Sequence, residues 1–278
     1  ITSADIITIG NSFTHGDEVL FEQSWPYYLS VLSNRSVINL GVGGYGIDQA
    51  ILSYLYTDID CDTVILGLIS GDFERATNIV YRGLYFGGTK TKPMFVFTSD
   101  GKDSIINQPC IYGNKLKNEF IKGENSNLFQ NEKAFHPLIF RNQLFDFSYL
   151  YRLAKMFWLR SIISKKPIYI STDSRYEYIK NVLLQFSSIA ENKGNVPLVV
   201  LLGNANSFND RKGNIYNWRK METDLLGLGI LSINTADSLY QIYINDPKKI
   251  INEYGLHYTD FANKMVAGLI NKHLIINN

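Results

Sequence analysis

The sequence predicts an α/β protein with three layers, in which helices cover both faces of a five-stranded parallel sheet. Short apolar runs alternate with helix-like segments at both ends of the chain, as in a parallel sheet. The run TVILGLIS, which begins at Thr63, is apolar on both strand faces, as expected of a strand covered on both sides. A chain of 278 residues with 45% hydrophobic content can also bury one large core.

The N-terminal elements follow in regular order. We expect strands at 5–10, 35–41 and 63–70, and helices at 25–33 and 47–56. Ser24 is a suitable N-cap for the first helix, and Pro26 lies in its first turn, where a missing N–H costs little.

Residues from about 73 to 166 interrupt the alternation, because this region is rich in Asn, Lys, Gly and aromatic residues. We interpret it as an insertion at the sheet edge within a single domain, 1–278. It contains a predicted β-hairpin that turns at Asp100-Gly101 and a predicted helix at 147–163. The alternation then resumes with helices at 176–192, 218–226 and 258–273, and strands at 196–203 and 229–235.

Composition argues against several classes of function. The formal net charge is +1 and the basic residues are dispersed, so we expect no nucleic-acid partner. The longest apolar runs are far shorter than the roughly 20 residues of a spanning helix, so we expect no transmembrane segment. The four histidines show no metal-ligand spacing, and Cys61 and Cys110 allow at most one internal disulfide. We expect neither a metal nor a cofactor.

The stretch NLGVGGYGIDQ, residues 39–49, contains the pattern G-x-G-x-x-G and allows three interpretations. A dinucleotide site carries this pattern after the first strand, with an acidic residue at the tip of the next strand. Here the pattern follows the second strand, and Asp60 and Asp62 precede the third strand. The glycines alternatively make only a tight turn. In the third interpretation they form part of a catalytic site.

Polar residues and glycines follow the ends of several predicted strands. Ser12 follows the first, Gly44 the second, and Asn204 the fourth, while His257 precedes the last helix. Ligands of open α/β sheets bind outside the carboxyl ends of the strands. We therefore expect a serine, backbone N–H donors and a histidine to converge there.

These residues resemble the SGNH/GDSL hydrolase family. The resemblance rests on Gly10-Asn11-Ser12, on NLGVGGYGIDQ, on VILGLISGDF and on NEYGLHYTDFANKMVAGLI, and it spans the chain apart from the insertion. It implies a flavodoxin-like sandwich. It also implies that Ser12 is the nucleophile, that Ser12 and Gly44 donate backbone N–H groups to an oxyanion, and that His257 is the general base.

The sequence departs from the family pattern at two positions. Gly71 stands where the family has an asparagine that donates to the oxyanion, so Gly71 is the matching oxyanion position, with Ser70 or Asn204 as substitute donors. Tyr254 stands where the family has the catalytic aspartate. Glu253 is the leading substitute for that acid; Asp72 or a backbone carbonyl are alternatives. Asn11, Asp72 and Asn204 are further expected to bind substrate.

The resemblance implies a serine-dependent esterase that removes small acyl groups, acetyl-like, from a carbohydrate and acts outside the cytoplasm. A polysaccharide O-acyltransferase would use the same Ser12 and His257. The two departures leave open an inactive glycan-binding module. Aromatic residues of the insertion, Tyr81, Tyr85, Phe86 and Trp158, either stack on sugars or pack against the protein.

Overall fold

The computed structural model describes residues 2–80, 90–97, 103–106, 110–132, 144–163, 174–212 and 218–276. The chain divides into two compact units. The first comprises Ile1–Asp72 and Lys180–Asn278, and the second comprises Phe73–Ile179. The predicted attachment of an insertion to the sheet edge stays a prediction.

The first unit contains the predicted five-stranded parallel sheet. Its strands, in spatial order, are β2 (Val37–Asn39), β1 (Ser3–Gly10), β3 (Asp60–Leu68), β6 (Val196–Leu201) and β7 (Ser232–Asn234), and every neighbouring pair is parallel. From β1 the chain first moves to β2 on one side of β1. It then crosses to β3 on the other side of β1 and continues outwards to β6 and β7. This reversal places the switch point of the sheet, where ligands bind in such folds, between β1 and β3.

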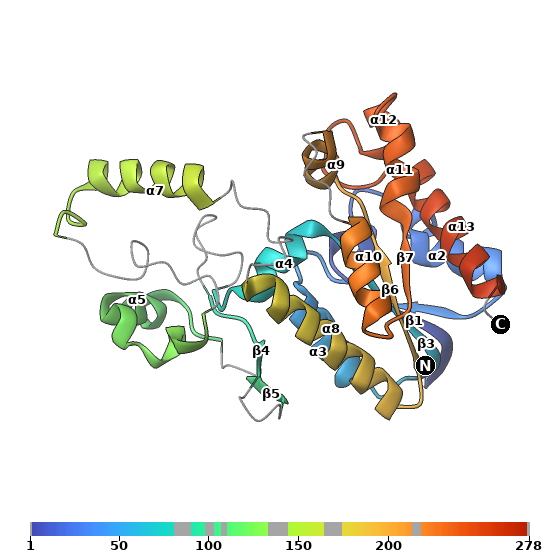
Figure 1. Ribbon diagram of the computed structural model, residues 1–278, viewed down its shortest axis with the longest axis horizontal. Coiled ribbons are helices and arrows are strands. Elements are labelled where there is room, and N and C mark those ends of the chain that lie inside the picture. The colour runs from blue at the N-terminus through green and yellow to red at the C-terminus, as the bar shows by residue number, and fades with distance from the viewer. Residues whose placement is uncertain are drawn as a thin grey trace. The chain divides into compact units, whose positions relative to one another are not determined.

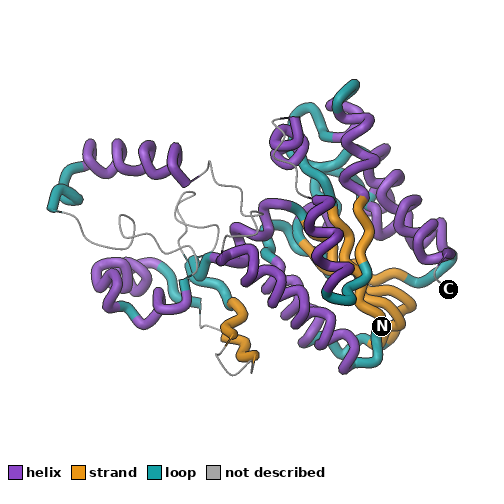
Figure 2. The backbone as a smooth tube through the Cα atoms, in the orientation of Figure 1, coloured by secondary structure: helices purple, strands orange, loops and turns teal. Residues whose placement is uncertain are grey.

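Helices cover both faces of this sheet, which confirms the predicted three-layer α/β/α arrangement (Figures 1 and 2). On one face lie α2 (Trp25–Ser33), α11 (Thr235–Tyr243) and α13 (Asp260–Ile276), and on the other α3 (Ile47–Leu55), α8 (Ser174–Asn192) and α10 (Trp218–Gly227). In β1, Ile6 and Ile7 point to opposite faces and both are fully buried. The core therefore lies on both sides of the sheet.

The structure also contains short helices that the sequence analysis did not predict. They are α1 (Ser12–His15), η1 (Phe21–Gln23), α4 (Ser70–Thr77), α9 (Ala205–Lys212) and α12 (Pro247–Ile250). Most are too short to show a helical period of apolar residues. Two of them, α1 and α4, begin directly after β1 and β3 and shape the site described below.

The second unit contains a two-stranded antiparallel sheet of β4 (Met94–Phe97) and β5 (Asp103–Ile106), where the hairpin was predicted. The predicted turn at Asp100-Gly101 lies outside the described residues. The unit also holds α5 (Gly113–Lys122), η3 (Gly123–Asn125), η4 (Asn127–Asn131) and α7 (Tyr149–Ile163). Tyr81, Tyr85 and Phe86 lie outside the described residues, and Trp158 on α7 is 53% exposed.

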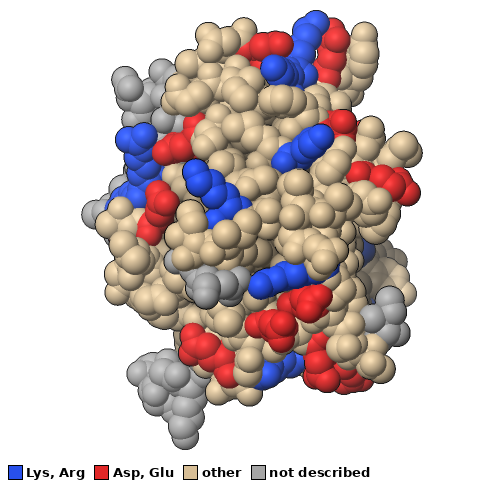
Figure 3. Space-filling view, turned by 90° about the vertical axis from the view of Figure 1, so that its right-hand side faces the viewer, with Lys and Arg blue, Asp and Glu red and all other residues tan. Residues whose placement is uncertain are grey.

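Four further observations on the described residues concern surface charge, helix apolarity, clusters of possible metal ligands and the cysteines. Lysine and arginine side chains are interspersed with acidic ones on the face shown in Figure 3. Within the described ranges, no helix combines the length and apolarity needed to cross a membrane. The same part of the chain holds no group of three or more His, Cys, Asp or Glu residues suited to a metal ion. Cys61 and Cys110 are both free thiols.

Candidate active site

Ser12 lies just past the carboxyl end of β1, as the first residue of α1. Asn11 caps this helix, because its Oδ1 accepts a hydrogen bond from the Phe13 N–H at 2.8 Å. The Asn11 Nδ2 donates to Asp72 Oδ2, which also accepts from the Ile69 N–H at 2.9 Å. The turn after β1 is thereby tied to the turn after β3.

This link gives Asn11 and Asp72 a structural role, and their predicted contact with substrate stays a prediction. Their exposed fractions are only 1% and 2%, and they hydrogen-bond to each other. Buried polar groups are usually paired in this way. Both residues hold the scaffold that presents Ser12.

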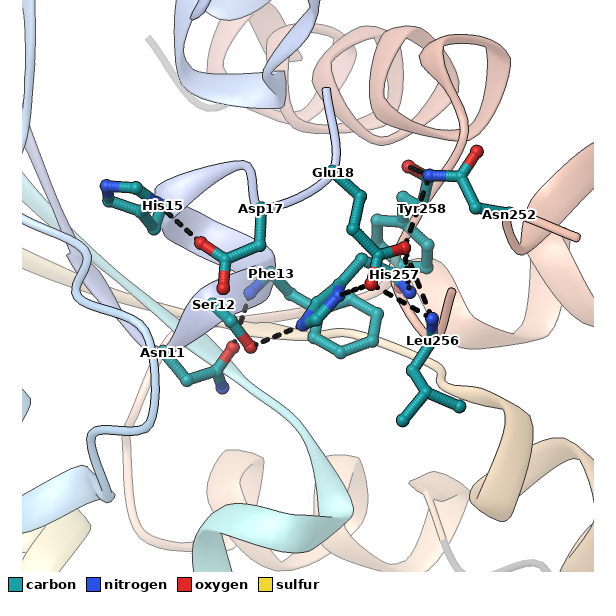
Figure 4. A network of polar contacts seen from close by, with 10 residues as sticks. All are labelled: Asn11, Ser12, Phe13, His15, Asp17, Glu18, Asn252, Leu256, His257 and Tyr258. Carbon is teal, nitrogen blue, oxygen red and sulfur yellow. Dashed lines mark hydrogen bonds and ion pairs between the residues drawn. The ribbon is translucent and has the colours of Figure 1, made fainter. Parts of the chain in front are cut away.

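His257 reaches Ser12 from the opposite end of the sequence (Figure 4). Its Nε2 lies 2.8 Å from Ser12 Oγ. The imidazole ring packs against the ring of Phe13, with centroids 5.0 Å apart, and only 19% of its side chain is exposed. The next residue, Tyr258, is buried and donates its hydroxyl to the Gly203 carbonyl at 2.5 Å. The turn that carries His257 is therefore fixed to the end of β6.

The carboxylate that contacts His257 is Glu18, in the loop after α1 (Figure 4). Glu18 Oε1 lies 2.6 Å from His257 Nδ1. The same carboxylate accepts from the backbone N–H groups of Leu256 at 3.1 Å and His257 at 3.2 Å. Because a carboxylate only accepts, the proton of the neutral imidazole lies on Nδ1, and Nε2 is free to accept from Ser12.

This contact corrects the predicted acid. Glu253 instead pairs with Lys248 at 2.5 Å, on the exposed surface. Asp72 is bonded to Asn11 and Ile69, as described above. The prediction searched residues close to His257 and at strand ends, whereas Glu18 is 239 residues away in sequence.

Glu18 is held in its ionised form by its hydrogen bonds. Partial burial acts to raise the pKa of its carboxyl group. The hydrogen bonds from the His257 side chain and from the backbone N–H groups of Leu256 and His257 outweigh that effect, and the pKa is lowered. Glu18 is therefore negatively charged at neutral pH, which suits a partner for an imidazole that gains a proton.

The glycine loop of residues 39–49 runs beside the Ser12 turn. The Val42 N–H donates to the Gly10 carbonyl at 3.1 Å, and Gly44 adopts a φ of 84°, which favours glycine. Neither the Ser12 nor the Gly44 N–H has an acceptor among the described residues.

The position of Asp60 bears on the dinucleotide interpretation. Asp60 is the first residue of β3, so it lies at the end of the sheet opposite Ser12, as the argument against a dinucleotide site assumed.

Gly71 leaves space where the family pattern has a side chain. A Cβ built on Gly71 would meet only Ile69 Cδ1, at 3.7 Å.

Asn204 lies after β6, and its Oδ1 accepts from the Ser207 N–H at 2.9 Å and from the Ser70 hydroxyl at 3.2 Å. These two donors fix the orientation of the amide, and its NH₂ group has no partner among the described residues. Asn204 thus retains the donor needed for the predicted substrate contact.

Sequence reasoning missed one residue of this site, Glu18. The only signal was indirect, because the lack of an aspartate before His257 required an acid from elsewhere. Several carboxylates fitted that requirement, including Asp17 beside Glu18. Only the three-dimensional turn geometry selects Glu18.

Solved structures similar to this one were found, although no family profile and no curated protein matches the chain. One, from the lipolytic G-D-S-L family of Desulfitobacterium hafniense, is 13% identical, with 98% of this chain and 99% of that chain covered and a TM-score of 0.49. A member of the same family from Veillonella parvula is 12% identical over 99% and 98% of the chains, with a TM-score of 0.47.

A third crystal structure is 11% identical over 99% of this chain and 97% of its own, with a TM-score of 0.50. Sequence identities this low describe a likeness of fold and leave the chemistry to be argued from the site. The chain therefore shares an α/β/α fold with a solved structure over nearly its whole length.

Proposed function

We propose that this protein is a serine ester hydrolase of the SGNH/GDSL type, with Ser12 as nucleophile and His257 as general base. One observation carries the proposal: Ser12 Oγ, the His257 imidazole and the Glu18 carboxylate form a continuous chain of hydrogen bonds. A nucleophile, a base and a group that orients the base are the parts required for acyl transfer through serine.

In the proposed reaction, Ser12 Oγ attacks the ester carbonyl carbon while its proton moves to His257 Nε2. The resulting oxyanion collapses, the bond to the alcohol oxygen breaks, and that oxygen takes the proton from Nε2. A water molecule then attacks the acyl-enzyme, again giving its proton to Nε2. Collapse of the second oxyanion returns the proton to Ser12 Oγ and releases the carboxylic acid. The cycle needs no cofactor.

The backbone N–H groups of Ser12 and Gly44 are the proposed donors to the oxyanion, since both lack an internal acceptor. Gly71 contributes no side-chain donor, and loss of one such donor typically costs about 100- to 1000-fold in rate. A Cβ at position 71 makes only an ordinary contact with Ile69 Cδ1, at 3.7 Å, so a side chain can begin there. Gly71→Asn is therefore expected to raise kcat on a simple acetyl ester.

The proposed substrate is a small acyl ester on a carbohydrate, and the proposed location is outside the cytoplasm. Both follow from the family resemblance, and the unpaired NH₂ group of Asn204 supports a polar substrate. An O-acyltransferase would share every step up to the acyl-enzyme and differ only in whether water or a sugar hydroxyl attacks it. The intact Ser12–His257–Glu18 chain favours either enzyme over an inactive glycan-binding module, because a module that only binds needs no such alignment.

The test is the intact mass of the protein after exposure to a fluorophosphonate, which reacts with activated serines. We expect one adduct on the wild type and none on Ser12→Ala or His257→Ala. Release of free acetate from an acetylated glycan, measured with and without a sugar acceptor, then separates hydrolysis from transfer. A folded wild type without an adduct would contradict the proposed nucleophile. Glycan binding that Ser12→Ala leaves unchanged would then favour the binding module.

A further inference from the structure

We propose that Glu18 is the positioning residue for His257, and that the acid of this site has moved from the turn before the histidine to the loop that follows the nucleophile. The inference rests on the proposed hydrolase function and deepens it. It identifies a residue that no sequence motif marks, and it assigns a purpose to Gly255, which the resemblance leaves without one.

The first argument is the set of donors around the Glu18 carboxylate. His257 Nδ1 and the backbone N–H groups of Leu256 and His257 all point to it, at 2.6, 3.1 and 3.2 Å. Figure 4 shows these contacts converging on one carboxylate group. A group accepting three N–H donors is fixed in place and stays charged. It can therefore hold the imidazole tautomer and stabilise the imidazolium that forms when Ser12 loses its proton.

The second argument is the space at Gly255. A Cβ built on Gly255 would lie 1.7 Å from Glu18 Oε2 and 2.2 Å from Glu18 Cδ. Any other residue at this position would therefore expel the carboxylate. Gly255 is not among the glycines of positive φ, so its backbone angles do not require glycine. Close approach of Glu18 is the reason for a glycine here.

The third argument is the backbone of Glu18 itself. Its φ of 69° lies in the left-handed region, which residues with a Cβ rarely adopt. Among the described residues, Asn34 is the only other non-glycine residue of positive φ, and Asn34 is the C-cap of α2, where this conformation is common. Glu18 caps no helix, because Gly16 is the C-cap of α1. The unfavourable backbone of Glu18 is explained by the direction in which it aims the carboxylate.

The experiment compares Glu18→Gln with the wild type, using the rate of fluorophosphonate labelling and the kinetics of p-nitrophenyl acetate hydrolysis. Glutamine keeps the shape of the side chain but loses the charge and can favour the wrong imidazole tautomer. We expect kcat to fall by about 100-fold or more, with KM changed by less than about threefold.

Gly255→Ala is a second variant that keeps the Glu18 side chain but displaces it. We expect it to lower kcat by about tenfold or more, while circular dichroism shows the native fold. Two matched controls are Asp17→Asn, the same type of change in the neighbouring residue, and Gly268→Ala, in open space on α13. Both controls should stay within about threefold of the wild type, since neither contacts His257.

A proton NMR signal separates a positioning role of Glu18 from a purely structural one. The proton NMR spectrum of the wild type should contain a strongly downfield resonance from the His257 Nδ1–H, shared with Glu18, and Glu18→Gln should remove it. If the wild type is labelled by the fluorophosphonate and Glu18→Gln is labelled at the same rate, the inference is overturned while the proposed function stands. An unlabelled, folded wild type would overturn both.

Discussion

This protein contains two histidine–carboxylate pairs whose carboxylates, Asp17 and Glu18, are neighbours in the sequence. The two pairs have the same contact distance but differ in the exposure of the histidine and in the other contacts of the two side chains. In both pairs the imidazole Nδ1 lies 2.6 Å from a carboxylate oxygen. His15 is the last residue of α1, Asp17 lies two residues further on, and 57% of the His15 side chain is exposed. His257 and Glu18 are 239 residues apart, and only 19% of the His257 side chain is exposed.

The comparison shows that a short contact does not by itself make a catalytic pair. His257 packs on Phe13 and presents Nε2 to Ser12, whereas His15 lies on the far side of Asp17 from that contact (Figure 4). Glu18 is also held by two backbone N–H groups. Restraint of both partners distinguishes the proposed site from an exposed surface pair, whose contribution is usually small.

The largest expected difference comes from removing each imidazole. His257→Ala should lower kcat on a small ester by about 1000-fold or more, since the general base is lost. His15→Ala should stay within about threefold of the wild type. Steady-state kinetics with p-nitrophenyl acetate measures both, with thermal unfolding to verify that each variant is folded. Equal losses in the two variants would remove the distinction between the pairs.

Moving the carboxylate from position 18 to position 255 should give the next largest change in kcat. Glu18→Gly relieves the left-handed backbone and should reduce kcat by about 100-fold, in line with removal of the acid. Adding Gly255→Asp places a new carboxylate where that of Glu18 lay, because the built Cβ of residue 255 starts in that volume. We expect the double variant to recover about tenfold of the lost rate. The same Gly255→Asp change in the presence of Glu18 should instead lower activity, because two carboxylates compete for one space.

Thermodynamic stability should separate the pairs by a smaller amount. Glu18 and Asp17 are both about a third exposed, but Glu18 also accepts from two backbone N–H groups, so Glu18→Gln should lower the free energy of unfolding by about 1 kcal/mol. Asp17→Asn should change it by less than about 0.5 kcal/mol. Urea denaturation at pH 7 gives both values. A larger effect for Asp17→Asn would mean that the hydrogen bonds from the backbone to Glu18 do not set the difference in stability.

The smallest effect is a dependence of that stability difference on pH. The pKa of Glu18 is lowered from its ordinary value of 4.5, so the folded state favours the ionised form. Its contribution is fully present above 4.5 and is lost as the pH falls through the lowered value. The gap between wild type and Glu18→Gln should thus narrow as the pH falls below 4.5 and Glu18 is protonated. A gap that widens below 4.5 would show that the sign is wrong.

The sequence predicted the sheet and its long helices because their apolar periods are local. The run from Thr63 and the segment of α2 are examples, and the structure places both within a few residues of the prediction. Ser12, Gly44 and His257 could be proposed because each lies in a recognisable motif next to a strand or helix end. Glu18 could not, because its role depends on an unusual backbone angle and on the lack of a side chain at Gly255, where its carboxylate lies.

The site joins the two ends of the described chain, and this has a consequence for biosynthesis. Ser12 and Glu18 are made before His257, which follows more than 200 residues later, and α2 and α13 contact each other through the Trp25 N–H and Asn263 Oδ1 at 3.2 Å. A ribosome-bound chain that ends before His257 has no imidazole partner for its serine. We expect such nascent chains to be inert towards a fluorophosphonate, so that reactivity reports synthesis through His257 and folding of the site.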